Sequence, residues 1–284
     1  MESASALSKQ AEARTTNQNR DVPKLVLIDG HALAYRAYHA LPLTLSTSQG
    51  ELTNAVFGFA SMLLNVWRDE KPDYIAVTFD KGPTFRHKEY KAYKAHRAKA
   101  PDEMVSQLSR IVELVEALNI PIFAVEGYEA DDVLGTLAKQ AAETGLETLI
   151  VTGDTDAFQL IDVHTKVLTS RRKFSDTVIY DEKGIKERFG LEPRQLIDYK
   201  GLVGDTSDNI PGVRGIGQKT ATRLLRKYGS LENIYEHLDE ISGERFRRAL
   251  AENRDQAVLS KYLATIVTEV PITLDLEACQ AGDY

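Results

Sequence analysis

Carboxylate side chains recur in this sequence at the points where short apolar runs end. The run 149–151 is followed by Gly153 and then by Asp154 and Asp156, two acids spaced two residues apart. A short apolar run broken by glycine predicts a buried strand, and ligands of open α/β sheets bind beyond the carboxyl ends of such strands. On this stretch alone a second interpretation is equally good, in which Asp154 or Thr155 caps a helix and Asp156 only favours its dipole.

The same succession of strand and acid occurs elsewhere in the chain, and this recurrence favours the functional interpretation. The expected strands 24–28, 74–79 and 121–125 each lead into acids, as does the segment 201–209 further on. Acids in the first turn of a helix would also suit its dipole, but that role does not require so many. The acids collected in this way are Asp29, Asp80, Glu129, Asp131, Asp132, Asp154, Asp156, Asp205 and Asp208.

Nine carboxylates in one cleft predict a site for divalent cations. Like charges raise one another's pKa, so the acids cannot all stay ionised without a counter-ion. No histidine or cysteine stands beside them at a ligand spacing, and ligation by oxygen alone suits Mg²⁺ or Mn²⁺ better than zinc. Two such ions suit in-line displacement at phosphorus.

The segment 81–99 has the opposite charge. Seven lysines and arginines stand there against the single acid Glu89, with Tyr90 and Tyr93 between them. Basic side chains interleaved with aromatic ones suit phosphate neutralisation and base stacking, although a charge run is more often a solvated face. Because no apolar stripe ties the segment to a core, we expect it to project. Arg86 and Lys91 are candidate DNA contacts.

A glycine-rich hairpin follows the pair Asp205 and Asp208. Such a hairpin presents backbone N–H groups at the start of the expected helix 218–227, where they can hold a phosphate. The helix carries basic residues and no acid, as expected of a helix–hairpin–helix that grips the DNA backbone without reading bases. The candidate DNA contacts here are Gly212, Gly215, Gly217, Lys219, Thr220 and Arg223.

Strands that alternate with helices position these residues. They predict an α/β fold, with a mainly parallel sheet covered by helices on both faces, and a helical pattern after residue 181. We therefore divide the chain into a disordered tail 1–23, an α/β core 24–180 and a helical region 181–284 that contains the helix–hairpin–helix 201–228. A basic turn at 171–173 is expected between two edge strands.

Bulk properties exclude several classes of protein. The chain has 284 residues, of which 43% are hydrophobic, enough for a sizeable core. No apolar run approaches the roughly 20 residues that span a bilayer, so no membrane association is expected. Cys279 is the only cysteine, which excludes an internal disulfide and favours a cytoplasmic location. The net charge of −7 argues weakly against a general nucleic-acid binder, but the basic residues are concentrated locally.

With these motifs in place, residues 24–280 resemble the 5′-nuclease domain at the N-terminus of bacterial DNA polymerase I, in the flap-endonuclease superfamily. The matching motifs are 77–80, 129–132, 153–156 and 204–209 with its glycine hairpin, together with Asp29. The resemblance implies a PIN-like core with a helical arch over the active site, matching residues 82–100. It also implies that Arg36, Tyr93, Lys94 and Arg97 contact or flank the scissile phosphate.

The resemblance further implies a structure-specific 5′→3′ exonuclease and 5′-flap endonuclease that uses two or more Mg²⁺ or Mn²⁺ ions. It implies K⁺ at the helix–hairpin–helix, and DNA partners that include flaps, nicked or gapped duplex and RNA primer ends. We expect Asp131, Asp132, Asp154 and Asp156 to bind metal directly. A monomer is expected in the bacterial cytoplasm, associated with the nucleoid, with a polymerase domain possible beyond residue 284.

Two other classes fit less well. A haloacid-dehalogenase-like phosphatase needs Asp-x-Asp after its first strand, where this chain has Asp29, Gly30 and His31. A non-catalytic DNA-binding module would keep the hairpin and the basic segment. It would have no use for nine acids, whose field repels phosphate.

Overall fold

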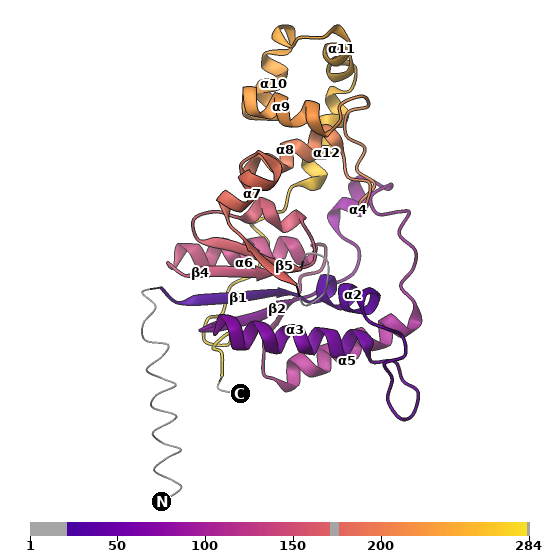
Figure 1. Ribbon diagram of the computed structural model, residues 1–284, viewed down its shortest axis with the longest axis vertical. Coiled ribbons are helices and arrows are strands. Elements are labelled where there is room, and N and C mark those ends of the chain that lie inside the picture. The colour runs from indigo at the N-terminus through magenta and orange to yellow at the C-terminus, as the bar shows by residue number, and fades with distance from the viewer. Residues whose placement is uncertain (1–21, 171–175, 283–284) are drawn as a thin grey trace, which may run out of the picture.

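A six-stranded sheet forms the centre of the N-terminal two thirds of the chain in the computed structural model, which describes residues 22–170 and 176–282 (Figure 1). The strands are β1 (Lys24–Asp29), β2 (Tyr74–Thr78), β3 (Ile122–Phe123), β4 (Glu147–Val151), β5 (Thr165–Ser170) and β6 (Thr177–Tyr180). Their order is β3-β2-β1-β4-β5-β6, and only β6 runs antiparallel to its neighbour. The predicted parallel α/β sheet is therefore confirmed, while the expected tail 1–23 lies outside the described residues except at its last two positions, and the basic turn 171–173 lies outside them entirely.

Helices cover both faces of this sheet, as the uninterrupted apolar character of its central strands requires. Val26 and Ile28 of β1 face the cluster under α2 (Gly30–Ala40), α3 (Asn54–Glu70) and α5 (Asp102–Ala117). Leu25 and Leu27 face the opposite cluster, which includes α6 (Ala130–Glu143). All four of these β1 side chains are fully buried.

The strand order places a topological switch point between β1 and β4. These two strands are parallel neighbours, with Ile28 opposite Val151, but the chain leaves them toward opposite edges of the sheet. A crevice is expected at their carboxyl ends, and there Asp29 ends β1 and Asp154 follows β4.

A second, helical core lies beyond the sheet (Figure 1). It is built from α7 (Glu182–Phe189), α8 (Leu196–Val203), α9 (Gln218–Tyr228), α10 (Leu231–Glu236), α11 (Glu244–Glu252) and α12 (Arg254–Ala264). Short 3₁₀ helices occur at Asp156–Leu160, Pro193–Gln195 and Leu238–Glu240.

The end of the described chain returns from the helical core to the sheet. Gln280 forms a β-bridge with Tyr74, and the carbonyl of Cys279 accepts a hydrogen bond from the Ile75 N–H at 2.8 Å. Cys279 is fully buried in the same apolar cluster as β1 and α6. The last segment therefore fastens the C-terminal part of the chain to the start of β2.

The first part of the basic segment packs inward rather than projecting, while residues 95–99 are exposed. In residues 82–100 only α4 (Phe85–Glu89) is helical, and turns follow it. Arg86 and Tyr93 are each 2% exposed, because they pack inward against acids and against the α12 end. The apolar stripe that would have predicted this is absent, since polar side chains anchor the segment instead.

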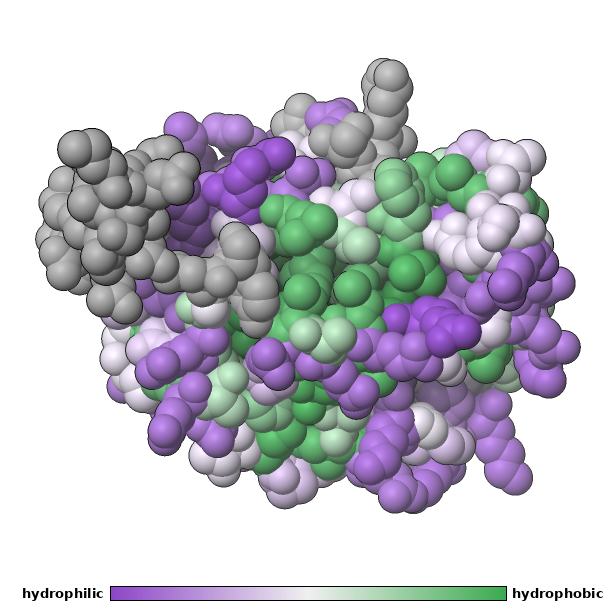
Figure 2. Space-filling view, turned by 90° about the horizontal axis from the view of Figure 1, so that it is seen from below, coloured by the Kyte–Doolittle hydropathy of each residue, from purple (hydrophilic) through white to green (hydrophobic). Residues whose placement is uncertain are grey.

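The underside of the molecule carries exposed apolar side chains. Figure 2 shows hydrophobic residues gathered on this face, where α3 and α5 lie. Among the large exposed apolar side chains of these helices are Phe57, Leu64 and Val105. In the described ranges no helix is both long enough and apolar enough to cross a membrane.

Candidate active site

The acids at the carboxyl ends of the strands gather around Asp131. Asp29 accepts hydrogen bonds from the Ala32 N–H and the Thr152 hydroxyl, so it caps α2 and also joins β1 to the residue that follows β4. Asp154 accepts from the Asp156 N–H at 2.9 Å. One oxygen of Asp131, Oδ1, is buried with no hydrogen-bond partner. Capping of backbone N–H groups therefore explains the positions of Asp29 and Asp154, but it does not explain the buried Asp131 oxygen.

Burial and mutual repulsion raise the pKa values of Asp29, Asp131 and Asp156. Burial raises the pKa of Asp131 well above its usual value, and the charges of Asp29 and Asp154 add to the shift. Burial likewise raises the pKa of Asp29 to about 7. The pKa of Asp156 also rises to about 7, through burial that outweighs the attraction of Lys200. A cluster of carboxylates with raised pKa values is a site that a cation would stabilise.

A cleft of about 600 Å³ opens over these acids. It is lined by His31, Ala32, Tyr35, Asp80, Lys94, Arg97, Ala98, Glu129, Ala130, Asp131 and Asp154. Acids from the strand ends and bases from the segment after α4 therefore share one cavity. Asp80 also accepts a hydrogen bond from the Ala130 N–H at 2.7 Å, which ties the end of β2 to the start of α6.

Basic side chains neutralise several of the predicted metal ligands. Lys94 Nζ lies 2.7 Å from Glu129 Oε1 and 3.6 Å from Asp208 Oδ2, while Arg97 Nη2 lies 2.5 Å from Asp208 Oδ1. Although burial opposes its charge, these acids raise the pKa of Lys94. The backbone of Lys94 has φ of 53°, a left-handed conformation that costs a lysine about 1–3 kcal/mol.

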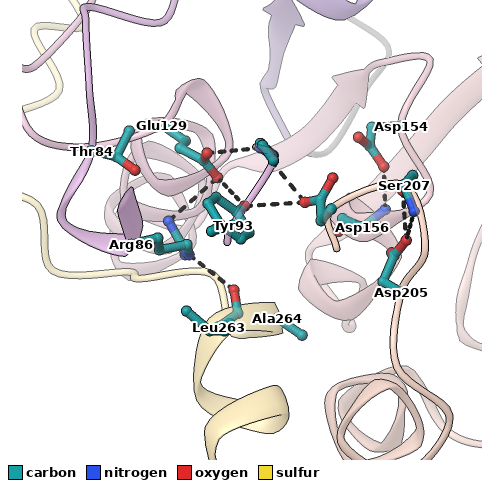
Figure 3. Close-up of polar contacts among 12 residues, drawn as sticks. Thr84, Arg86, Tyr93, Glu129, Asp154, Asp156, Asp205, Ser207, Leu263 and Ala264 are labelled. Atoms are coloured by element: carbon teal, nitrogen blue, oxygen red, sulfur yellow. Dashed lines mark hydrogen bonds and ion pairs between the residues drawn. The ribbon is translucent and has the colours of Figure 1, made fainter. Parts of the chain in front are cut away.

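Lys200, which the sequence did not single out, bridges two further acids. Its Nζ contacts Asp156, and lies 2.6 Å from Asp205 Oδ2. Burial acts in the opposite direction, but Lys200 lowers the pKa of Asp205 to about 2. Figure 3 shows Asp154, Asp156 and Asp205 grouped on one side of the site, and Glu129 with Tyr93 on the other. Within residues 22–170 and 176–282, no three potential ligand groups are already arranged to hold one ion.

Asp132 and Arg86 are placed inside the protein rather than in the cleft. Arg86 donates to both oxygens of Asp132, at 2.7 and 2.8 Å, and these oxygens also accept from the backbone N–H groups of Glu129 and Val267. Asp132 is fully buried, with four internal donors. The expectations of a metal ligand at Asp132 and a DNA contact at Arg86 are therefore corrected, because neither side chain faces the cavity.

Tyr93 is also enclosed. Its hydroxyl lies 3.0 Å from Glu129 Oε2 and 3.0 Å from Asp208 Oδ2, and its single proton can be donated to only one of them at a time. The structure thus makes Tyr93 a link between the acids of α6 and those of the hairpin region. Its expected contact with a phosphate would require the buried ring to move.

Arg36 lies on the other side of the loop that carries Asp154. It lines a separate cavity with Gly153, and its Nη2 donates to the Ser170 carbonyl at 3.0 Å. The sequence grouped Arg36 with Lys94, but the two side chains line different cavities. His31 and Tyr35, on the same helix α2 as Arg36, line the acid cleft instead. His31 and Tyr35 are four residues apart and so share one face of the helix, and this spacing could have predicted that both line the cleft.

The hairpin between α8 and α9 is held by close backbone packing. A side chain on Gly212 would come within 2.2 Å of the Gly204 nitrogen, and Gly212 has φ of 63°. The N–H of Gly212 donates to the Ser260 hydroxyl, so it is not free for a phosphate. Gly217 and Lys219 are exposed, and Thr220 is half-buried. The hairpin residues thus divide into those that shape it and those that can meet a ligand.

Comparison with known proteins agrees with this arrangement. Residues 24–190 match the family model described as "5'-3' exonuclease, N-terminal resolvase-like domain", and residues 191–284 match "5'-3' exonuclease, C-terminal SAM fold". A parallel sheet with acids at its switch point and a helix–hairpin–helix beside it defines a nuclease of this class. The chain belongs to the 5′-3′ exonuclease family.

Its curated relatives include DNA polymerase I of Chloroflexus aurantiacus, 52% identical over 266 residues, and that of Bacillus subtilis, 48% identical over 258 residues. These alignments cover 92% and 90% of this chain but only 28% and 29% of the relatives. The chain therefore spans less than a third of the length of these proteins.

Solved structures share the fold at low identity. The bacteriophage T5 flap endonuclease, in a complex with DNA and metal ions, matches with a TM-score of 0.73 at 21% identity and covers 86% of this chain and 90% of its own. The catalytic core of Rad2 with DNA substrate matches with a TM-score of 0.55 at 16% identity, over 85% of this chain and 78% of its own.

Proposed function

We propose that this nuclease hydrolyses DNA phosphodiesters near 5′ ends, as a 5′-flap endonuclease and 5′→3′ exonuclease that depends on divalent metal ions. The observation that carries the proposal is the buried Asp131 oxygen without a partner, beside Asp29 and Asp156, whose pKa values are raised. Neither feature stabilises the fold, and both suit a cation held by oxygen ligands.

The residues present fit Mg²⁺ or Mn²⁺. Asp131, Asp154 and Asp156 would hold one ion, with Asp29 beside them, and Asp205 with Asp208 would take part in holding a second. Asp80 and Glu129 would act through water. When bound, such ions make a water nucleophilic and stabilise the oxygen that leaves phosphorus. The ion pairs of Lys200 and Arg97 must loosen for Asp156, Asp205 and Asp208 to serve as ligands.

The chain's own bases supply the remaining chemistry. Lys94 reaches into the cleft from above and can donate to a phosphoryl oxygen once it leaves Glu129. Arg97, half-exposed at the cleft wall, would orient the same phosphate. Tyr35 lines the cavity beside His31 and can stack on a terminal base. Together these groups would bind the end of a DNA strand and hold its phosphate in one orientation.

The proposed substrates and partners follow the family. They are 5′ flaps, nicked or gapped duplex and RNA primer ends, with K⁺ at the helix–hairpin–helix. The T5 flap endonuclease structure with DNA and metal ions, and the curated relatives named DNA polymerase I, support this choice. We further propose a monomer in the bacterial cytoplasm at the nucleoid, and a polymerase domain in longer proteins that contain this chain.

A cleavage assay with a labelled 5′-flap duplex tests the function. We expect no cleavage in excess EDTA, recovery with Mg²⁺ or Mn²⁺, and a loss in Asp131→Asn with unchanged folding. The matched control is Asp239→Asn, an acid of the short helix Leu238–Glu240 in the helical region, away from the sheet. Full activity of the parent chain in EDTA would disprove the metal-dependent mechanism. An absence of cleavage under every metal condition would favour a non-catalytic DNA-binding module.

A further inference from the structure

Arg188, in the last turn of α7, is an exposed cation held in place by three aromatic rings. Its guanidinium carbon lies 5.1 Å from the ring centroid of Phe189, 5.2 Å from that of Tyr180 and 5.5 Å from that of Phe158. Its Nη1 also donates to the Tyr180 hydroxyl at 2.9 Å. Among the described residues no acid forms an ion pair with it.

This arginine stands between two cavities. One, of about 470 Å³, is lined by Arg188, Phe189, Lys219, Arg223 and Arg226, with uncharged side chains completing the lining. The other, of about 420 Å³, is lined by Arg36, Gly153, Thr155, Thr169, Ser170, Tyr180 and Arg188. Among described residues neither lining contains an acid, in contrast to the cleft over Asp131. Figure 1 shows α7 between the sheet and α9, as this bridging position requires.

The five arginines and lysines of these linings form a row that we name the basic track: Arg36, Arg188, Lys219, Arg223 and Arg226. One end lies at the start of α9. The other lies at Gly153, one residue from Asp154 in the acid cleft. A row of cations that joins two cavities through one side chain matches an extended polyanion better than a compact anion.

We propose that Arg188 binds a backbone phosphate of duplex DNA and continues the duplex path from the hairpin helix α9 to the acid cleft. The proposal rests on the proposed function and adds a contact to it. Arginine's planar fork matches phosphate oxygens, and the aromatic cup fixes its plane before DNA arrives, so less side-chain freedom is lost on binding. Arg223 is seated in a similar way, 5.7 Å from the ring centroid of Phe246.

The test compares neutral variants of Arg188 with a variant that removes the same charge elsewhere. Arg188→Met keeps the apolar stem in the cup, and Arg188→Gln keeps a hydrogen-bond donor toward Tyr180. Arg110→Met is the control, because Arg110 is exposed on α5 at the far side of the sheet. Affinity for a nicked duplex is measured in EDTA, so that the DNA stays intact, at several salt concentrations, with thermal melting as the check on folding.

Loss of one phosphate contact should reduce the slope of log affinity against log salt by about one. The affinity ratio of parent to variant should therefore shrink about fourfold as salt rises from about 50 to about 200 mM. Both Arg188 variants should show this change on duplex, while Arg110→Met and the binding of single strands should not.

Parent-like slopes in a folded Arg188 variant would overturn the proposal, since a purely structural role would lower the melting temperature alone. If Arg188→Met does not fold, Arg188→Gln decides. An equal loss on single strands would overturn the assignment to duplex. None of these outcomes depends on cleavage, so the contact can fail while the nuclease assay succeeds, and the reverse.

Discussion

Lys94 combines a strained backbone with a partly buried charge, and this combination favours the prediction that it takes part in catalysis. Its N–H donates to the Asp208 carbonyl at 2.9 Å, which holds the left-handed turn, and its ammonium points at Glu129. Strain of this kind persists only where the surroundings impose it. Lys91, three residues earlier in the same segment, is exposed and is the natural comparison.

We expect Lys94→Ala to lower the single-turnover rate of flap cleavage roughly 10²–10³-fold, since a charge contact made mainly in the transition state is worth about 2.7–4 kcal/mol. DNA affinity should change little, because other bases of the segment remain. Lys91→Ala should leave the rate unchanged. Rapid-mixing cleavage and anisotropy binding give the two quantities. If Lys94→Ala bound DNA more weakly but cleaved it at an unchanged rate, Lys94 would only hold a phosphate and would not take part in catalysis.

The raised carboxyl pKa values predict how metal binding responds to pH. Asp29 and Asp156 have pKa values of about 7 in the folded chain, against an ordinary 3.8. Between these values the folded state holds more protons than the unfolded state, so the metal-free protein loses stability as pH rises through this range. A divalent ion needs ionised ligands and must displace those protons.

Mg²⁺ should therefore bind more weakly at about pH 6 than at about pH 8.5, and should release more protons at the lower pH. Calorimetric titration in buffers with different heats of ionisation measures both quantities. Equal proton release at the two pH values would show that the carboxylates are already ionised without metal.

At the scale of elements, the short helix α4 is fixed by one buried ion pair. Arg86 joins it to Asp132 in α6 and to the carbonyls of Leu263 and Thr265 at the end of α12. This pair occupies the first turn of α6, where Asp131 projects into the acid cleft. The position of Lys94 and Arg97, which follow α4 and line the cleft, thus depends on α4 being fastened to α6 and α12.

Arg86→Met should destabilise the protein by about 3–5 kcal/mol, because it leaves the Asp132 charge buried without a counter-charge. Lys88→Met, an exposed neighbour on α4, should have little effect. Chemical denaturation measures both. Adding Asp132→Asn to Arg86→Met should recover part of the loss. A double variant no more stable than Arg86→Met would mean that the loss does not come from the stranded charge.

The start of α9 offers a substitution that the fold itself should tolerate. Gly217 has φ of −97°, and a side chain placed there would meet no atom of the described protein within 4 Å. We expect Gly217→Ala to melt like the parent but to bind duplex less tightly, because the added methyl group blocks close approach of a phosphate. Gly212→Ala, which collides with Gly204, should instead lower the melting temperature. Unchanged duplex affinity in Gly217→Ala would place the phosphate elsewhere.

The sequence predicted the strands, the major helices and the placement of acids at the strand ends, because apolar periodicity and glycine breaks report local structure directly. It could not predict which acids meet bases. Lys200 lies 44 positions from Asp156, and Arg86 lies 46 from Asp132, so only tertiary packing decides these pairs. The inward turn of Tyr93 was missed for the same reason, since its anchors are polar and distant.

At the scale of the whole molecule, the two regions that match the family models, 24–190 and 191–284, are joined by contacts as well as by the chain. The helical core begins after β6, yet its last segment returns to pair with β2, and Val267 and Val270 donate to Asp132 and Thr136 of α6. The division at 180/181 remains a prediction about sequence regions. Physically, the sheet and the segment after α12 share one apolar cluster.

That returning segment carries Cys279, whose rate of chemical modification reports how often the chain end leaves the sheet. Burial raises the pKa of the Cys279 thiol to about 12, and no part of the residue is exposed, so a thiol reagent can reach it only when the segment detaches. Since Cys279 packs with β1 and α6, we expect its modification rate to rise with denaturant as steeply as global unfolding does. A rate insensitive to denaturant would mean that the chain end peels away alone. With Cys279 as the only cysteine, the label reports on the detachment of that end alone.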